Sequence, residues 1–121
     1  MDRRKFPRIN TNTFISFVKY NKNGQIENQK TGTAIDVSQG GILLETTEKI
    51  DTKSISIITT SSNNKLIEIK ATVLYTRQVD SEKFQNGISL QGNPGENLRF
   101  VTGLVHAYLL RKKSQNRNIF L

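Results

Sequence analysis

The chain has 121 residues, a length that allows one domain with a proper hydrophobic core but not two. It holds no cysteine, which excludes disulfide bonds and thiolate chemistry, and no apolar run long enough for a membrane span or a signal peptide. A cytoplasmic protein is therefore expected. The formal net charge of +8 indicates an anionic partner, either a nucleic acid, an acidic surface or a phosphorylated small molecule.

The chain begins with a basic segment, DRRKFPR, which holds four cations within residues 2–8. Proline disfavours helix at the residue before it, and no apolar pattern anchors the segment, so residues 1–10 are expected to form a mobile, extended arm. In an extended chain Arg4 and Arg8 lie roughly 13–14 Å apart and can hold a ligand from two sides. Guanidinium groups pair with phosphate and with the O6/N7 edge of guanine. A solvated basic tail is the alternative.

Six segments rich in β-branched or aromatic residues, or alternating in polarity, predict strands. They are residues 11–20, 29–37, 41–47, 53–60, 66–76 and 86–90. A hairpin turn is expected at Asn23-Gly24, a tight turn at residues 38–41 and a polar turn at residues 61–64. Strands at such short spacing predict an antiparallel barrel or sandwich. The aromatic residues Phe14, Phe17 and Tyr75 lie in strand patterns typical of a core.

The periodicity then changes to that of an amphipathic helix. Asn93 is expected as its N-cap, with Pro94 at the first helical position and Glu96 completing a capping box. Lys112 and Lys113 suit its C-terminus. The apolar stripe that should pack on the barrel consists of Leu98, Val101, Leu104, Val105, Tyr108 and Leu109. Residues 114–121 would then be a basic tail.

Neither catalysis nor metal binding is indicated. His106 is the sole histidine and lies at the edge of the apolar stripe, where a partly exposed helix residue is expected. One histidine without cysteine cannot build a zinc site, and no nucleophile elbow is present. We therefore expect a protein that is not an enzyme and needs no cofactor.

A second segment, DVSQGG, complements the arginine pair. Asp36 and Ser38 are two residues apart at a strand end, so extended geometry would direct both side chains the same way. A carboxylate can accept hydrogen bonds from N1–H and N2–H₂ of guanine, and a hydroxyl can add a contact. Gly40 and Gly41 would allow a tight turn and close approach to a ligand. An ordinary Asx-turn is the alternative reading. Both segments together describe a receptor for an anionic guanine nucleotide.

This combination resembles the PilZ domain family, whose signature is R-x-x-x-R followed by [D/N]-x-S-x-x-G. Arg4 and Arg8 match the first motif, and Asp36, Ser38 and Gly41 match the second. The strand-rich pattern, the last strand NGISL and the final helix are also similar to the family, so the resemblance covers roughly residues 3–111.

The resemblance implies a six-stranded antiparallel β-barrel with a C-terminal helix, over residues 1–113, that binds cyclic di-GMP. Arg4 and Arg8 would hold phosphate and guanine, while Asp36 and Ser38 would read a guanine. Arg3, just before the first motif, implies a stacked pair of ligand molecules. Binding would change the surface for a downstream protein, without nucleic acid or a membrane span.

One position departs from the family pattern, and two alternative functions remain. Leu90 stands where many members carry an aromatic residue, and a core position is expected there. The first alternative is a basic barrel that binds nucleic acid, using residues 111–121; the expected burial of the aromatic residues argues against it. The second is a PilZ-type interaction module without a ligand, against which the complete signature argues.

Overall fold

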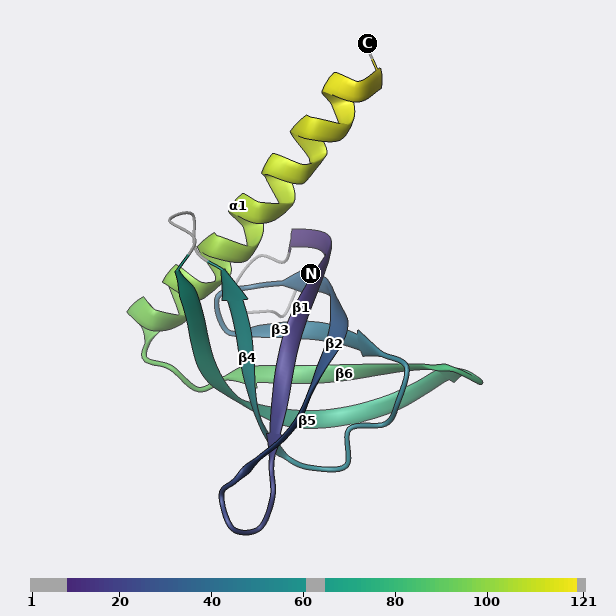
Figure 1. The fold of residues 1–121 in the computed structure, drawn as a ribbon, viewed down its shortest axis with the longest axis vertical. Coiled ribbons are helices and arrows are strands. Elements are labelled where there is room, and N and C mark those ends of the chain that lie inside the picture. Colours follow the sequence, from purple (N-terminus) through teal and green to yellow (C-terminus); the bar gives the residue numbers. More distant parts are fainter. Residues whose placement is uncertain (1–8, 61–64, 120–121) are drawn as a thin grey trace, which may run out of the picture.

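The computed structural model describes residues 9–60 and 65–119, which form a closed barrel followed by a helix (Figure 1). The strands are β1 (Ile9–Tyr20), β2 (Ile26–Val37), β3 (Gly41–Thr46), β4 (Ser54–Thr60), β5 (Leu66–Asp80) and β6 (Lys83–Leu90), and the helix is α1 (Pro94–Ile119). Neighbouring strands pair antiparallel in the order β1-β2-β3-β6-β5-β4. The predicted fold, a six-stranded antiparallel barrel with a C-terminal helix, is confirmed.

Several strands are longer than the sequence pattern indicates. Ile9 and Asn10, assigned above to the N-terminal arm, begin β1, and β2 begins at Ile26. The charged segment between the last two strands, expected to be a loop, is largely a β5–β6 hairpin in which Asp80 pairs with Lys83. The polar composition of this segment is typical of a loop, so the sequence pattern does not indicate strands there. Long polar side chains nevertheless pair across the two strands of the hairpin. The polar turn at residues 61–64 lies outside the described residues.

The β1–β2 hairpin turn is present where Asn23-Gly24 predicts it, but its two residues differ in conformation. Gly24 has a φ of 76°, whereas Asn23 is not among the residues with positive φ. Asn21 organises the turn, since its Oδ1 accepts hydrogen bonds from the backbone N–H groups of Asn23 and Gln25 at 2.9 and 3.0 Å. Glycine is therefore needed at one position only.

The core fills the barrel interior and follows strand alternation along β1. Ile15 and Phe17 are buried there, whereas Phe14 points outward and is 75% exposed. The prediction that Phe14 belongs to the core is therefore wrong. Leu90 is buried, as expected. The buried hydrophobic cluster is Ile15, Phe17, Ala34, Val37, Ile42, Leu44, Ile50, Ile55, Ile57, Ile69, Ala71, Val73, Ile88, Leu90, Phe100, Val101 and Leu104.

A bulge in β5 reverses which side chains face inward. Val73 pairs with Ile88 and Tyr75 with the adjacent Gly87, so Leu74 is an extra residue in the strand. Beyond it Tyr75 faces outward and is 55% exposed, which overturns its assignment to the core. The next residue, Thr76, donates a hydrogen bond of 2.8 Å to Oδ1 of the buried Asn86.

Helix α1 begins at the predicted capping box. The Oδ1 of Asn93 accepts a hydrogen bond from the N–H of Glu96 at 2.9 Å, and the N–H of Asn93 donates to Oε1 of Glu96 at 3.3 Å. Helix α1 contacts β1, β4 and β5. Its residues Phe100, Val101 and Leu104 are buried and belong to the hydrophobic core cluster.

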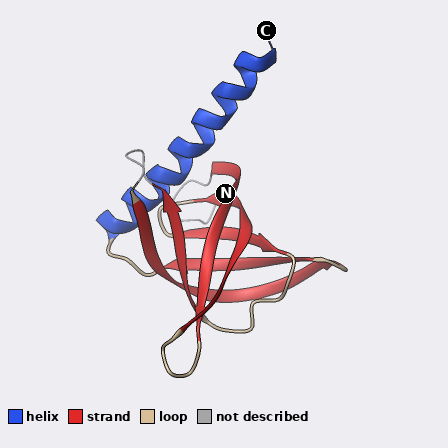
Figure 2. Cartoon of the chain, in the orientation of Figure 1, coloured by secondary structure: helices blue, strands red, loops and turns tan. Residues whose placement is uncertain are grey.

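The predicted apolar stripe is wrong at its ends. Leu98 and Leu109 are 51% and 54% exposed, while the fully buried Phe100 was not predicted. The reason is that only part of α1 lies on the barrel, whereas its C-terminal half projects away from the strands (Figure 2). The helix also continues beyond Lys113, through most of the expected tail, to Ile119. Within the described residues, no helix combines the length and apolarity required to cross a bilayer.

Candidate functional site

The β1–β2 register brings the start of the described chain to the DVSQGG segment. Ile9 pairs with Val37, and Asn10 pairs with Asp36. Arg3, Arg4 and Arg8, the predicted ligand-binding residues of the arm, lie outside the described residues. The described chain therefore enters the barrel directly beside the second motif, at the end of β1 opposite to the Asn23-Gly24 hairpin.

The DVSQGG segment forms the tight turn between β2 and β3. The N–H of Ser38 donates to the carbonyl of Gly41 at 2.8 Å, and the N–H of Gly41 donates back to the carbonyl of Ser38 at 3.3 Å. The Ser38 side chain is buried, and its hydroxyl makes a long hydrogen bond of 3.4 Å to the same Gly41 carbonyl. Asp36, by contrast, is half-buried on β2.

Two neighbouring elements fix this turn in place. The N–H of Leu90 on β6 donates to the carbonyl of Gly40 at 3.1 Å. The side-chain amide of Gln39 reaches the carbonyl of Pro94, at the first residue of α1, with a distance of 3.5 Å. The turn is thus hydrogen-bonded both to β6 and to the start of the helix.

Gly41 has a packing requirement of its own. A Cβ atom at this position would lie 2.5 Å from the backbone carbonyl oxygen of Ile88 on β6. Backbone atoms cannot move aside as a flexible side chain can, so β3 and β6 approach this closely only because residue 41 is glycine.

A row of paired residues crosses the outer face of the barrel from the second motif. Asp36 on β2 pairs with Leu43 on β3, Leu43 with Gly87 on β6, and Gly87 with Tyr75 on β5. A shallow depression of about 250 Å³ lies along this row. Its lining residues are Asp36, Ile42, Leu43, Leu74, Tyr75, Gly87 and Ile88. Ser38 is not among them, so the structure brings Asp36, but not the Ser38 side chain, to this surface.

Tyr75 is the residue of this depression that sequence reasoning missed. Strict alternation in β5 places it in the core with Val73, but the bulge turns it outward. A signal for the bulge was present: Leu74 and Tyr75 are consecutive large apolar residues in a strand that otherwise alternates. Two adjacent residues of this kind cannot both face a core in regular pleating.

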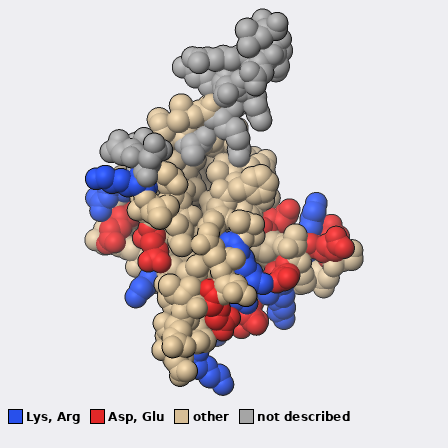
Figure 3. All heavy atoms as spheres, in the orientation of Figure 1, with Lys and Arg blue, Asp and Glu red and all other residues tan. Residues whose placement is uncertain are grey.

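Other features of the described chain do not add a catalytic centre. His106 is exposed, and no group of three metal-ligating side chains occurs among residues 9–60 and 65–119. Acidic and basic side chains are interspersed on the face in Figure 3. A depression of about 600 Å³ lies between the exposed Phe14 and the β5–β6 turn, away from Asp36.

Two ion pairs attach the loop between β3 and β4 to the β1–β2 hairpin. Lys19 Nζ lies 3.0 Å from Asp51 Oδ1, and Lys30 pairs with Glu48. The hydrogen bond from Lys30 and its positive charge lower the pKa of Glu48, and Lys19 lowers the pKa of Asp51 in the same way. All four side chains belong to the far end of the barrel from the DVSQGG turn.

Solved structures with the same fold show low sequence identity. The complex of MrkH from K. pneumonia with c-di-GMP matches with a TM-score of 0.60 and 19% identity, over 94% of this chain and 56% of that one. The PilZ domain of YcgR from Escherichia coli with c-di-GMP gives 0.59 and 14%, over 94% of this chain and 98% of that one. The Bacillus subtilis inhibitor of motility MotI/DgrA gives 0.56 and 17%, over 95% and 53%.

The chain thus spans about half the length of MrkH and nearly all of the isolated YcgR domain. No curated protein matches it. The family model described as PilZ domain matches residues 2–105, a range that includes the arginine motif, the DVSQGG turn and the whole barrel. The chain therefore belongs to the PilZ domain family, a family of non-catalytic modules that generally bind cyclic di-GMP.

Proposed function

We propose that this chain is a cytoplasmic receptor for cyclic di-GMP that binds the ligand between its N-terminal arginine motif and the DVSQGG turn. The observation that carries the proposal is the β1–β2 register, in which Ile9 pairs with Val37 and Asn10 with Asp36. Arg8, the last residue of the first motif, is joined to Ile9 by a peptide bond, so this motif ends within one residue of the strand pair that carries Asp36. Family membership supports the ligand.

Each motif has a distinct chemical part in this proposal. Arg4 and Arg8 pair with phosphate and with guanine through charge-assisted hydrogen bonds. Asp36 accepts hydrogen bonds from N1–H and N2–H₂ of a guanine, a donor pair that adenine lacks, and the buried hydroxyl of Ser38 supports the turn beside it by donating to the Gly41 carbonyl. Gly40 and Gly41 keep the backbone of the turn free of side chains beside the ligand.

A stacked pair of cyclic di-GMP molecules is part of the same proposal. Arg3 immediately precedes Arg4, so three guanidinium groups face the four phosphate charges that two cyclic dinucleotides carry. The residues of the arm would become ordered around the ligand, at a cost of roughly 1–2 kcal/mol for each residue fixed. The resulting surface would be read by a downstream protein.

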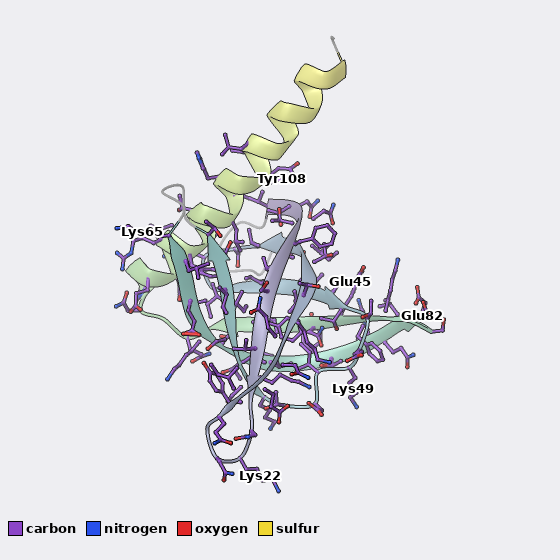
Figure 4. All side chains as sticks on the ribbon, in the orientation of Figure 1. Lys22, Glu45, Lys49, Lys65, Glu82 and Tyr108 are labelled. Atoms are coloured by element: carbon purple, nitrogen blue, oxygen red, sulfur yellow. The ribbon has the colours of Figure 1, made fainter. Side chains whose placement is uncertain are left out.

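Calorimetric titration with cyclic di-GMP tests the receptor function. We expect wild-type binding near micromolar, about −8 kcal/mol. Arg4→Ala and Asp36→Ala should each weaken it by about 10- to 150-fold, since a hydrogen bond to a charged group is worth about 1.5–3 kcal/mol. Lys22→Ala is the matched control for Arg4→Ala: it removes one positive charge from the loop at the opposite end of the barrel (Figure 4) and should bind normally.

The titration also separates the alternatives. A stoichiometry of two molecules per chain supports the stacked pair, and one molecule refutes it. Absence of binding by the folded wild-type protein would overturn the receptor function. Salt-sensitive binding to arbitrary DNA or RNA would then favour the nucleic-acid alternative, and its absence would favour a ligand-free interaction module.

Hydrogen exchange tests the proposed ordering of the arm. Amides of residues 2–6 and of Arg8 should become more protected when cyclic di-GMP is added, because ligand contacts would hold the backbone near Asp36. Protection should be unchanged at the β1–β2 hairpin turn around Gly24, which serves as the internal control. Equal protection of the arm with and without bound ligand would contradict this part of the proposal.

A further inference from the structure

We propose that the groove beside Phe14 is a docking site for the projecting C-terminal end of α1 from a second copy of this chain. The groove is the depression of about 600 Å³ between the outer face of the barrel and the β5–β6 turn, away from Asp36. This surface is separate from the proposed ligand site, so self-association through it does not depend on cyclic di-GMP.

An exposed aromatic ring forms the apolar part of the groove. Phe14 is 75% exposed on the outer face of β1, although phenylalanine is among the residue types most often buried. It pairs with Thr33 on β2, and Thr33 pairs with Glu45 on β3. Paired residues face the same side of a sheet, and neighbouring strands are about 4.8 Å apart. Phe14 and Glu45 therefore stand on one surface, separated only by the strand that carries Thr33.

The rim of the groove is acidic. The charged residues that line it are three carboxylates and one lysine, Glu45, Asp80, Glu82 and Lys83, which sum to a charge of −2. A hydrogen bond of 2.8 Å from the N–H of Glu82 to Oδ1 of Asp80 orders the turn on this rim. The Glu82 side chain stays exposed at the tip of the β5–β6 hairpin (Figure 4). Since residues 9–110 together carry +1, the groove is a local reversal of the sign of the charge.

The projecting end of α1 has the complementary character. Leu109 and Leu110 are 54% and 55% exposed, and this half of the helix lies beyond its own barrel (Figure 2). Residues 111–121 follow them with four cationic and no acidic side chains, a charge of +4. Two exposed leucines followed by a basic segment therefore match a groove that has an exposed ring and an acidic rim.

A second copy of the chain supplies this combination. Within one molecule α1 contacts β1, β4 and β5, whereas the groove is formed by Phe14, β2, β3 and the β5–β6 turn. Each chain carries one groove and one projecting end, so two copies can exchange ends and satisfy both contacts in a closed dimer. Once the first contact forms, the second is intramolecular, which favours the dimer over open chains.

Sedimentation equilibrium of the full chain tests the self-association. The wild-type protein should change from monomer to dimer as its concentration rises. Added salt should weaken the dimer, because it screens the attraction between the acidic rim and the basic segment. A wild-type protein that is still monomeric at about 1 mM would overturn the proposal.

Substitutions in the groove test which surface is used. Phe14→Thr keeps a β-branched strand residue but removes the ring, and should weaken the dimer by at least about tenfold through the loss of apolar burial. Its matched control is Leu66→Thr, since Leu66 is 78% exposed on β5 and does not line the groove. Glu82→Lys turns an attraction into a repulsion and should weaken the dimer by at least about threefold. Glu68→Lys, at an exposed position outside the groove, makes the same charge change and should dimerise normally.

A paramagnetic label tests what occupies the groove. The chain has no cysteine, so Ser114→Cys provides a single attachment point for a nitroxide within residues 111–121. Mixed with isotope-labelled wild-type protein, the nitroxide variant should broaden the NMR signals of the amides of Thr33, Glu45 and Glu82. The amide of Gly24, in the β1–β2 hairpin turn, should stay sharp as the internal control.

The outcomes separate this contact from other modes of association. Broadening at the groove, together with weaker dimers of Phe14→Thr and Glu82→Lys only, supports the proposal. Broadening confined to α1 would show that the projecting helices pair with each other, and would overturn it. Dimers of both groove variants that are as stable as those of wild type would also overturn it.

Discussion

Gly41 satisfies two requirements at once, one in the fold and one in the proposed site. It is the last residue of the D-x-S-x-x-G motif, and its Cα lies so close to β6 that a Cβ would be 2.5 Å from the Ile88 carbonyl oxygen. The motif glycine would therefore be required in this barrel even without a ligand. Loss of binding after its substitution would not by itself identify a ligand contact.

Gly41→Ala should lower the free energy of unfolding by about 1–3 kcal/mol, the usual cost of overpacking. Urea denaturation measures the change. The matched control is Gly103→Ala in α1, where nothing lies within 4 Å of the added Cβ and alanine is favoured in a helix by roughly 0.5–1 kcal/mol. The control should be neutral or stabilising. Equal stability of wild type and Gly41→Ala would refute the packing argument.

At the scale of the elements, the sequence pattern predicts the number, order and type of strands well. The reason is that alternation and turn residues are local properties, and the alternation within a strand indicates which of its side chains face the core. The sequence pattern does not predict features that depend on how one strand pairs with another. The bulge at Leu74 and the paired hairpin at Asp80–Lys83 depend on cross-strand register, which no single segment encodes.

The helix, too, was predicted only in part, because its buried face depends on the barrel against which it packs. Its start at Asn93 was predictable because a capping box is local. Its buried face was predicted only in part, since the barrel covers Phe100, Val101 and Leu104 but leaves Leu109 exposed. Periodicity identifies an apolar stripe, but only the length of the surface beneath it determines how much of that stripe is buried.

The ion pairs of the β3–β4 loop should make its attachment sensitive to acid. In the folded protein the pKa of Glu48 lies below its usual value of 4.5 and that of Asp51 below 3.8. Their contribution to stability is therefore present above these usual values and is lost as the pH falls through the lowered folded values. The carboxyl carbon chemical shifts in an NMR pH titration measure the pKa values of Glu48 and Asp51.

The substitution paired with this titration is Lys30→Met, whose long side chain has neither a charge nor a hydrogen-bond donor. It should return the pKa of Glu48 toward its usual value, because it removes both the main hydrogen bond to that carboxylate and the nearest positive charge. Asp51, which depends chiefly on Lys19, should remain low. Unchanged titration of Glu48 in the variant would show that the pair with Lys30 does not form in solution.

For the molecule as a whole, the charge is distributed unevenly along the chain. Of the formal net charge of +8, residues 1–8 contribute +3, residues 9–110 contribute +1 and residues 111–121 contribute +4. Residues 9–110 are thus almost neutral, and the excess positive charge lies in the two terminal segments. This partition was readable from the sequence, whereas the pairing of Ile9 and Asn10 with Val37 and Asp36 needed the β1–β2 register.

The candidate site was predictable to the same degree. Both motifs could be recognised, because their residues are contiguous in the chain. The link between Asp36 and Tyr75 could not, since it runs across four strands and passes through a bulge. Burial of the Ser38 hydroxyl within its own turn could not be predicted either, because the alternation of side chains applies only within a strand and Ser38 follows the end of β2.

The projection of α1 also affects how the molecule rotates in solution. At 1.5 Å per residue, its 26 residues span about 39 Å, and its C-terminal half extends past the barrel (Figure 1). Rotation about the long axis should be faster than end-over-end rotation. Backbone N–H bonds in α1 lie along the helix axis, so their NMR relaxation would report mainly the slower, end-over-end rotation. The N–H bonds of the strands would report a mixture of both rotations. A single correlation time would therefore misstate the internal mobility of either part.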